Sequence, residues 1–598
     1  MTRSSFSLTA QQQAIVEHAT GPALVVAVAG AGKTTAMVHR IARLVRTGVF
    51  PARQILATSF NRDASEQIRT ALRRWPACKD VHVRTLHSLG YSIIKTAVEE
   101  EELPPFTRKG GLDTSGRRTL FAALDLARQS HVAYAPQLAR LDYDEFLTYV
   151  GACKANLLYA DLRGQALPRT ARKLARQAKA PPGASWQLDF YRLYERVRIE
   201  KQWLTFDDML LTAWEVLHRR PDLLAAVQRR YRCVLVDEYQ DVNLVQAELL
   251  DMLVRPHGNF MAIGDDDQTI YTWRGASPDF FLGFAKRYGA RTFYMTENFR
   301  GRAGQLVLAN EVIRHNRRRH PKRLELTRGF GGAVTLTLHG SAQEQAYALA
   351  SDLAGLRRAG IPFRDMAVLV RVYAQTPPVE EALSAAGIPY RLVGEPPFYQ
   401  GGDTRKAVED DRDGVTITTI FRAKGMEWPV VCVPDCNDGL LPLAKAQHPD
   451  EERRLFYVAL TRAREQLRLY GVQGKPLSPF LLQANYADNL NAVRNMGEAL
   501  ARDPDQWTPG DYVAVGVNAK RLGLTSYIAA YWPASSARRG RVAEAVLAFY
   551  ALLRARRLQR RLQIGREDVR FWQGIAGAPL RPPPLERPDV ENALRQLR

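Results

Sequence analysis

The sequence predicts an α/β protein with two units, each built around a parallel β-sheet. In two separate parts of the chain, short apolar runs typical of buried strands alternate with longer stretches typical of helices. This alternation predicts parallel sheets, because a helix carries the chain back between neighbouring strands. Two further observations favour this class. Several apolar runs end in acidic residues, and a glycine-rich turn separates the first predicted strand from the first predicted helix.

The first unit is expected to contain four strands and a helical insertion. The strands are LVVAVA (24–29), QILATSF (54–60), CVLVDE (233–238) and FMAIGD (260–265), with a helix over 34–45. The stretch from about 95 to 200 is charged and mostly helical in pattern, with breakers at 104–105, 168 and 181–183. It is therefore expected to be inserted between two parts of the first unit, 1–94 and 201–295.

The second unit is expected over 296–478. Its strands are MAVLVR (366–371), VTITTI (415–420) and VVCVPD (430–435). The alternation stops near residue 480, so 479–598 is predicted to be a C-terminal region of unknown role. Within it, Val542, Val546, Phe549 and Leu553 follow helical spacing, and a basic cluster comes next. The cluster contains Arg554, Arg556, Arg557, Arg560 and Arg561. It is either a contact for a polyanion such as nucleic acid or a solvated basic helix face.

The charge balance indicates a polyanionic partner. The 598 residues include 84 Lys and Arg against 62 Asp and Glu, a formal net charge of +22. Nucleic acid is the simplest partner for such a chain. A generally basic protein without that role is the alternative.

Cysteine usage and hydropathy favour a cytoplasmic protein. None of the five cysteines belongs to a C-x-x-C pair, so reduced buried thiols are expected and a metal centre is not. Residues 22–29 resemble the core of a signal peptide, but no basic segment precedes them and they are too short to span a membrane. We therefore expect no targeting segment.

The segment AVAGAGKT (27–34) predicts a phosphate-binding loop, with Ala27 in place of the usual first glycine. Glycines let the backbone approach phosphates, and the N-terminus of the following helix favours negative charge. Lys33 is expected to reach the β- and γ-phosphates of a nucleotide, and Thr34 to ligate Mg²⁺. The loop residues expected to line this site are Ala29, Gly30, Ala31, Gly32, Lys33, Thr34 and Thr35.

The segment VLVDEYQD (234–241) predicts the second half of the nucleotide site. Asp237 follows a buried apolar run, so its carboxylate is expected at the carboxyl end of a strand, where it would hold Mg²⁺. Glu238 is expected to orient or deprotonate the attacking water.

Seven segments in order, over about residues 8–465, resemble the motifs of the UvrD/Rep/PcrA group of superfamily 1 helicases. They are LTAQQQAIV (8–16), AVAGAGKT (27–34), DEYQD (237–241), GDDDQTIYTWRGA (264–276), ENFR (297–300), TIFRAKGMEW (419–428) and EERRLFYVALTRARE (451–465). The resemblance implies two RecA-like motor domains and an ATP- and Mg²⁺-dependent enzyme. Such an enzyme moves on single-stranded DNA in the 3′ to 5′ direction, with DNA and DNA junctions as partners.

The resemblance also implies roles for individual residues. Gln12 would read the adenine edge, Phe299 would stack on the base, and Glu427 would contact the ribose. Gln268 would contact the γ-phosphate and couple it to DNA. Arg300 and Arg462 would act as arginine fingers on the developing charge of the transition state.

Single-stranded DNA is held by backbone contacts and aromatic platforms. By resemblance, the expected DNA-binding residues are Phe60, Asn61, His87, Tyr271, Trp273 and Arg274. If the segment YTW (271–273) is extended, Tyr271 and Trp273 point to the same face. The segment FDDML (206–210) resembles the one that precedes the second motif in this group.

Three features depart from the group's pattern. Thr35 stands where an arginine is common beside the nucleotide, and Phe421 stands where a histidine is usual. Only the 16 residues Tyr399–Gly414 separate VGEPPF from the strand at 415, so the large insert of the second motor domain is expected to be absent.

Three functions remain open at this point. The leading interpretation is a translocating DNA helicase. The alternatives are a DNA-binding protein with a relic ATPase, and a motor that strips proteins from DNA with little unwinding. A protein partner for the C-terminal region is a further expectation.

Overall fold

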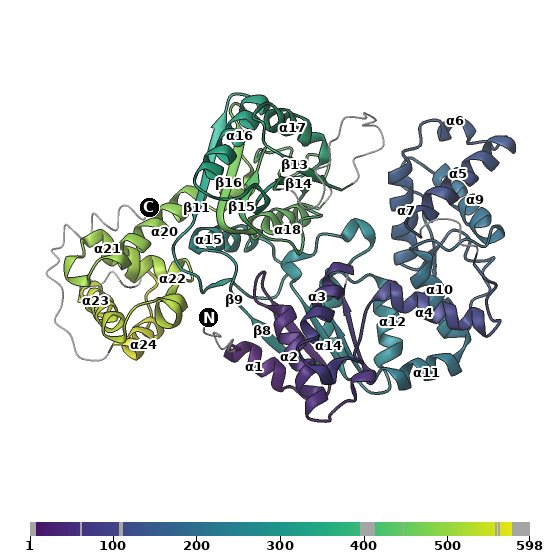
Figure 1. Ribbon diagram of the computed structural model, residues 1–598, viewed down its shortest axis with the longest axis horizontal. Coiled ribbons are helices and arrows are strands. Elements are labelled where there is room, and N and C mark those ends of the chain that lie inside the picture. The colour runs from purple at the N-terminus through teal and green to yellow at the C-terminus, as the bar shows by residue number, and fades with distance from the viewer. Residues whose placement is uncertain are drawn as a thin grey trace. The chain divides into compact units, whose positions relative to one another are not determined.

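A computed structural model describes residues 8–59, 62–106, 112–394, 413–446, 448–555, 559 and 562–576. It divides into two compact units, Met1–Ala27 with Gly32–Met295, and Val28–Ala31 with Thr296–Arg598. Each unit contains a six-stranded parallel sheet, and helices surround both sheets (Figure 1). The predicted α/β class with parallel sheets is therefore confirmed.

The sheet of the first unit has the strand order β3-β2-β6-β7-β1-β8. The bounds are β1 (Ala23–Ala27), β2 (Ile55–Ser59), β3 (His82–Thr85), β6 (Cys233–Val236), β7 (Phe260–Gly264) and β8 (Arg291–Met295). The four predicted strands are β1, β2, β6 and β7, and every residue in them is buried. The apolar pattern did not predict the edge strands β3 and β8, which bury only one of four and two of five residues.

Helices cover this sheet. They are α1 (Ala10–Glu17), α2 (Lys33–Arg46), α3 (Arg62–Leu72), α4 (Leu86–Glu99), α10 (Asp208–Arg219), α11 (Pro221–Arg230), α12 (Leu244–Val254), α13 (Pro278–Leu282) and α14 (Phe284–Tyr288). Side chains of α4, α10 and α12 share one apolar core with β1, β2 and β6, so these helices pack on the same face of the sheet.

The insertion between α4 and α10 has its own apolar core, to which Phe146 and Phe190 contribute. Its elements are α5 (Leu112–Gln129), α6 (Ala135–Leu138), α7 (Tyr143–Ala155), β4 (Leu158–Tyr159), α8 (Arg169–Arg172), β5 (Arg176–Gln177) and α9 (Trp186–Glu200). A buried ion pair attaches it to α10, because Lys154 Nζ lies 2.8 Å from a carboxylate oxygen of Asp208. Lys154 also pairs with Glu195 of α9 at 2.8 Å, and Arg198 of α9 lies 3.3 Å from Asp208, so a buried ionic network joins α7, α9 and α10.

The sheet of the second unit has the order β11-β16-β15-β12-β14-β13. The bounds are β11 (Ala333–His339), β12 (Met366–Val370), β13 (Tyr390–Val393), β14 (Val415–Thr419), β15 (Trp428–Val433) and β16 (Ala463–Val472). The three predicted strands are β12, β14 and β15. A short pair, β9 (Glu297–Asn298) and β10 (Glu325–Leu326), lies apart from this sheet. The helices are α15 (Ala303–Ile313), α16 (Ala342–Arg358), α17 (Thr376–Ala385) and α18 (Pro449–Leu460).

Strand β13 pairs with β14, which places Tyr390 beside Val415. The segment between these strands is the one whose shortness predicts the missing insert. Most of it, residues 395–412, lies outside the described residues. The expected absence of the insert therefore remains a prediction from chain length.

The C-terminal region is helical (Figure 1). Its elements are α19 (Pro479–Gln483), α20 (Tyr486–Ala501), α21 (Pro509–Val513), the π-helix η9 (Ala514–Asn518), α22 (Ala519–Arg521), the π-helix η10 (Tyr527–Tyr531), α23 (Ser536–Ala555) and α24 (Arg566–Ile575). Helix α23 buries Val542, Val546, Phe549 and Leu553, as their spacing predicts. Arg554 is exposed, whereas Arg556, Arg557, Arg560 and Arg561 lie outside the described residues.

Within the described part of the chain, no helix is both long and apolar enough to cross a membrane. All five cysteines are buried.

Candidate functional site

The glycine-rich turn joins β1 to α2. Gly30 and Gly32 have φ of +71° and +79°, a left-handed conformation that favours glycine. Gly32 precedes Lys33, the first residue of α2, and no described side chain caps this helix end. A Cβ on Gly32 would lie 2.9 Å from the side-chain amide nitrogen of Gln12. The turn thus presents the helix N-terminus to a ligand, which is the arrangement that binds phosphate.

Lys33 forms an ion pair with Glu238, with Nζ 2.6 Å from Oε1. Burial alone would lower the pKa of Lys33, but the carboxylates of Glu238, Asp237 and Asp265 outweigh it and raise the pKa. Lys33 therefore stays a cation and is paired with the general-base candidate. Glu238 has a φ of +54°, which is uncommon outside glycine and typical of functional sites.

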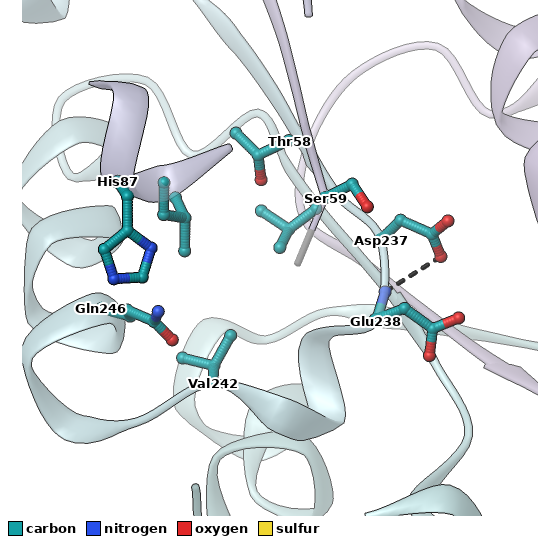
Figure 2. A pocket seen from close by; sticks show the side chains of 9 residues that line it. Thr58, Ser59, His87, Asp237, Glu238, Val242 and Gln246 are labelled. Atoms are coloured by element: carbon teal, nitrogen blue, oxygen red, sulfur yellow. Dashed lines mark hydrogen bonds between the residues drawn. The ribbon is translucent and has the colours of Figure 1, made fainter. Parts of the chain in front are cut away.

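Asp237 lies directly after β6 and is buried. Its backbone N–H donates to the Thr58 carbonyl of β2 at 2.9 Å, and its carboxylate accepts from the Glu238 N–H, also at 2.9 Å (Figure 2). A carboxylate here and the Thr34 hydroxyl in the first turn of α2 are hard oxygen donors, the kind that Mg²⁺ prefers. The residues present therefore fit a magnesium ion.

A chain of hydrogen bonds leads from Glu238 to Gln268. The Gln240 side-chain amide donates to Glu238 Oε2 at 2.5 Å, and its oxygen accepts from the Asp265 N–H at 2.9 Å. The Gln268 amide in turn donates to Asp265 Oδ2 at 2.7 Å. Gly264 leaves room for these hydrogen-bonded side chains, because a Cβ on Gly264 would collide with the Gln240 amide oxygen. The structure thus links the expected general base to the expected γ-phosphate sensor.

Sequence reasoning did not single out Gln240 and Asp265. Gln240 belongs to the second motif, after the carboxyl end of β6, and Asp265 belongs to the third motif, after the carboxyl end of β7. Those strands are neighbours in the sheet. A rule that pairs the ends of adjacent parallel strands could have found them.

Gln12 is buried, and it has a structural role besides the predicted one. Its side-chain oxygen accepts from the Thr9 N–H at 3.2 Å, while the Thr9 hydroxyl accepts from the Gln12 N–H at 3.3 Å. This reciprocal capping fixes the start of α1. The amide nitrogen of the same side chain faces Gly32. The structure therefore brings Gln12 to the phosphate loop, and adenine reading remains a prediction.

A narrow pocket separates the carboxylates from His87. Asp237 and Glu238 line one side and His87 and Gln246 the other, with Thr58 and Ser59 between them (Figure 2). The hydroxyl oxygens of Thr58 and Ser59 are buried without a hydrogen-bond partner among the described residues. The carboxylates of the expected hydrolysis site and the expected DNA-binding histidine therefore line one small cavity.

Two exposed aromatic side chains, Phe206 and Trp273, belong to the same candidate DNA track as His87. Its ring stacks on Phe206, with centroids 3.8 Å apart and an interplanar angle of 18°. Burial and the charge of Arg274 lower the pKa of His87 to about 3, so the ring is neutral. Trp273 is 41% exposed, and the Arg274 guanidinium lies 4.6 Å from its ring centroid. Phe206, also 41% exposed, was noted only as part of a segment and is an addition to the candidate track.

The condition under which Tyr271 and Trp273 would share a face is not met. Tyr271 and Trp273 do not lie on an extended segment, because Thr272–Arg274 forms a 3₁₀ turn. Gly275 ends the turn with a φ of +86°, and its N–H donates to the Thr272 carbonyl. The alternation that would put both rings on one face is therefore absent at this turn. Phe60 and Asn61 lie outside the described residues.

In the second unit, three predicted residues gather. Arg300 forms an ion pair with Glu427 and donates to the Thr461 carbonyl at 3.2 Å, next to Arg462. Burial tends to raise the pKa of Glu427, but Arg300 and its neighbours Arg464 and Arg462 lower it. Phe299, in contrast, is 41% exposed.

Arg462 is only 1% exposed. Its guanidinium donates to the Val458 and Met426 carbonyls, at 3.0 and 3.3 Å. It lies beside Arg300 and Glu427, yet part of its hydrogen-bonding capacity is used on its own backbone surroundings.

Phe421, which stands where a histidine is usual, contacts a cation. The guanidinium of Arg371 lies 5.0 Å from its ring centroid, and Arg371 also pairs with Glu452 at 2.6 Å. The position thus carries a cation–π contact. A phenyl ring has no group that can donate or accept a proton.

Comparisons with known proteins agree with the motif order. Residues 8–289 match the model of the UvrD/REP helicase N-terminal domain, and 293–407 and 401–473 match the UvrD-like helicase C-terminal domain. The ATP-dependent DNA helicase PcrA of Leuconostoc citreum is 33% identical over 65% of this chain and 50% of its own length. A probable DNA helicase II homologue of Rickettsia felis is 30% identical over 67% of this chain and 59% of its own.

A third relative aligns more completely. The ATP-dependent DNA helicase UvrD2 of Mycobacterium tuberculosis is 28% identical over 77% of this chain and 78% of its own length. The chain thus spans about half to three fifths of the first two relatives and more of the third. Because the two family models together match most of the chain, and the phosphate loop and the second and third motifs follow the carboxyl ends of the neighbouring strands β1, β6 and β7, the protein belongs to the UvrD-like helicase family.

Proposed function

We propose that the protein is an ATP- and Mg²⁺-dependent motor that moves along single-stranded DNA, in the 3′ to 5′ direction, and opens DNA junctions. The observation that carries this proposal is the hydrogen-bond chain from Lys33 through Glu238, Gln240 and Asp265 to Gln268. It connects the residues expected to bind and hydrolyse ATP with the third motif, which also carries Trp273.

The proposed chemistry starts with Lys33. When a nucleotide's phosphates reach the N-terminus of α2, they compete with Glu238 for the ammonium group. Release of Glu238 frees its carboxylate to orient or deprotonate the attacking water. When bound, Mg²⁺ would neutralise phosphate charge, held by Thr34 and Asp237. Arg300 and Arg462 are proposed to stabilise the charge that develops on the γ-phosphoryl group.

Phosphate release measured with and without single-stranded DNA tests this proposal directly. A DNA-stimulated ATPase is expected, and its absence would favour the relic ATPase. Strand displacement on 3′-tailed and 5′-tailed duplexes then tests direction. Displacement of a bound protein without displacement of a strand would instead favour a motor that strips proteins from DNA.

Substituting Trp273→Ala is expected to uncouple DNA from hydrolysis. Loss of one stacking platform costs about 1–3 kcal/mol, so single-strand affinity should fall about 5- to 150-fold. DNA stimulation of the ATPase should fall with it, while the basal rate changes much less. Fluorescence anisotropy with a labelled oligonucleotide and ATPase titration measure the two effects.

Tyr347→Ala is the matched control, because Tyr347 is a comparably exposed aromatic residue on α16, outside the motifs. If Trp273→Ala bound and responded to DNA like the control, the aromatic track would be misplaced.

The insertion offers a second contact, for duplex DNA. Between residues 162 and 188 the sequence has no acidic residue and six cations, all exposed. They are Arg163, Arg169, Arg172, Lys173, Arg176 and Lys179. They surround the small β4–β5 pair and α8 of the insertion. We propose that this basic cluster of the insertion holds the phosphates of the duplex at a junction.

Replacing the six cations with serine or glutamine should weaken strand displacement and spare single-strand-stimulated ATPase. The salt dependence of junction binding should also become shallower, by about 0.9 in log–log slope for each phosphate that the cluster no longer neutralises. Stopped-flow unwinding and binding at several salt concentrations measure these effects. An unchanged slope and unchanged unwinding would exclude the cluster as a duplex contact.

A further inference from the structure

The C-terminal helices contact the segment that supports Arg300. This segment, residues 325–332, begins with β10 and runs toward β11. One side of it faces Arg300 and the β16 end of the sixth motif, and the other side faces η10 and α20.

Arg328 makes the contacts on the first side. Its guanidinium donates to the Arg300 carbonyl at 2.6 Å and to the Arg464 carbonyl at 3.3 Å. The same group pairs with Glu465 at 2.5 Å, and Arg302 pairs with the other oxygen of Glu465 at 3.0 Å. Burial tends to raise the pKa of Glu465, but Arg302 and Arg328 lower it, so the carboxylate stays charged. Arg328 therefore ties the backbone of Arg300 to the backbone of the sixth motif.

Tyr527 and Phe330 make the contacts on the second side. Their rings meet edge to face, with centroids 5.5 Å apart and an interplanar angle of 76°. Gly329 has a φ of +95°, and a Cβ there would lie 2.7 Å from the Tyr527 hydroxyl oxygen. A Cβ on Gly497 of α20 would lie 3.1 Å from Phe330 Cβ. Phe330, two residues after Arg328, is therefore held between Tyr527 and α20.

Tyr531 makes a second link to the same region. Its hydroxyl donates to the carboxylate of Glu297 in β9, two residues before Phe299 and three before Arg300. Burial and this carboxylate raise the pKa of Tyr531, so its hydroxyl remains a donor. Strand β9 pairs with β10 at Glu297 and Glu325, and the Thr327 hydroxyl donates to the Asn298 carbonyl at 2.6 Å. The two links thus converge on β9, β10 and the residues that follow β10 up to 332, which together are called the β9–β10 support.

Tyr527 and Tyr531 are the first and last residues of the π-helix η10. Single-turn π-helices are rare and occur often at functional sites. Here both of the terminal tyrosines contact the β9–β10 support. Arginine fingers need close positioning, because a displacement of about 1 Å can cost about 10²-fold in rate.

We propose that the C-terminal helices position Arg300 for ATP hydrolysis. They act through Tyr527 and Tyr531, which contact the β9–β10 support, and through Arg328, which connects that support to Arg300. Tyr527, Tyr531 and Arg328 are therefore positioning residues, and the inference rests on the proposed role of Arg300. The C-terminal region would then set the turnover rate of the motor. A partner that moved η10 would change that rate without touching ATP or DNA.

The test uses the full chain with Tyr531→Phe, Tyr527→Leu with Tyr531→Phe, and Arg328→Gln. We expect kcat for DNA-stimulated ATP hydrolysis to fall, by about 10- to 100-fold in the double variant and in Arg328→Gln. The Kd for single-stranded DNA should stay within about twofold, because affinity for the strand is assigned to the aromatic track. Tyr550→Phe is the matched control. Its hydroxyl donates to the Gly516 carbonyl inside the same bundle, at 2.6 Å, so it should affect bundle stability and leave kcat unchanged.

A double-mutant cycle with Arg300→Ala decides the mechanism. If the tyrosines act through Arg300, the double tyrosine variant should cause little further loss in the Arg300→Ala background. An equal loss in both backgrounds, an unchanged kcat, or the same loss in Tyr550→Phe would overturn the inference and leave the proposed function standing. Normal turnover by Arg300→Ala alone would overturn the role of Arg300 itself.

Discussion

Lys33→Ala is expected to abolish ATP turnover and to leave single-strand binding nearly unchanged. Removing one preorganised donor from a developing negative charge costs about 10²–10³-fold in kcat, and Lys33 also carries a full charge. The substitution removes the ion-pair partner of Glu238 as well, which leaves that carboxylate without its 2.6 Å contact. Phosphate release under saturating DNA measures the effect, and anisotropy measures binding.

The control for this variant is Lys95→Ala. Lys95 is an exposed residue of α4 that forms a surface pair with Glu99, and surface pairs contribute little. Its turnover should match that of the unaltered chain. Substantial hydrolysis by Lys33→Ala would show that the phosphate loop is not part of the ATP hydrolysis site.

Glu238→Gln is expected to bind ATP and hydrolyse it about 10²–10⁴-fold more slowly, because the general base is lost while the side-chain shape is kept. The amide can still occupy the position between Lys33 and Gln240. Nucleotide affinity should therefore change much less than kcat. Single-turnover hydrolysis and binding of a fluorescent ATP analogue separate the two quantities.

Glu99→Gln, the partner of the lysine control, is the matched control here because its side chain is exposed. A Glu238→Gln variant that lost ATP binding together with turnover would show a structural role for Glu238. A variant with normal turnover would exclude it as the base.

The sequence alone identified the parts of the fold whose signal is local. The turn between β1 and α2 and the carboxylates after β6 combine a buried strand with a short motif, and both features lie within a few residues of each other. The helical spacing of Val542, Val546, Phe549 and Leu553 is equally local, and α23 buries all four. Edge strands were missed because β11, for example, has no fully buried residue and so no apolar run.

The turn at Thr272–Arg274 shows where local reasoning was insufficient. An alternation of aromatic residues predicts a shared face only if the backbone is extended. Gly275 instead closes a 3₁₀ turn, and it packs so closely on α7 that a Cβ there would lie 2.6 Å from the Asn156 side chain. The insertion, more than 100 residues earlier in the chain, therefore takes part in shaping this turn.

The sequence by itself determined the family, the parallel α/β class and the residue types expected to handle phosphate, because each depends on short segments read in order. Only the tertiary structure decided that Gln240 and Asp265 connect Glu238 to Gln268, and that Tyr527 and Tyr531 contact the support of Arg300. The Gln240–Asp265 contact depends on which strands become neighbours in a sheet. The tyrosine contacts depend on where the C-terminal helices pack. Residues separated by 25 to more than 200 positions meet through those choices, and no local pattern in the chain encodes them.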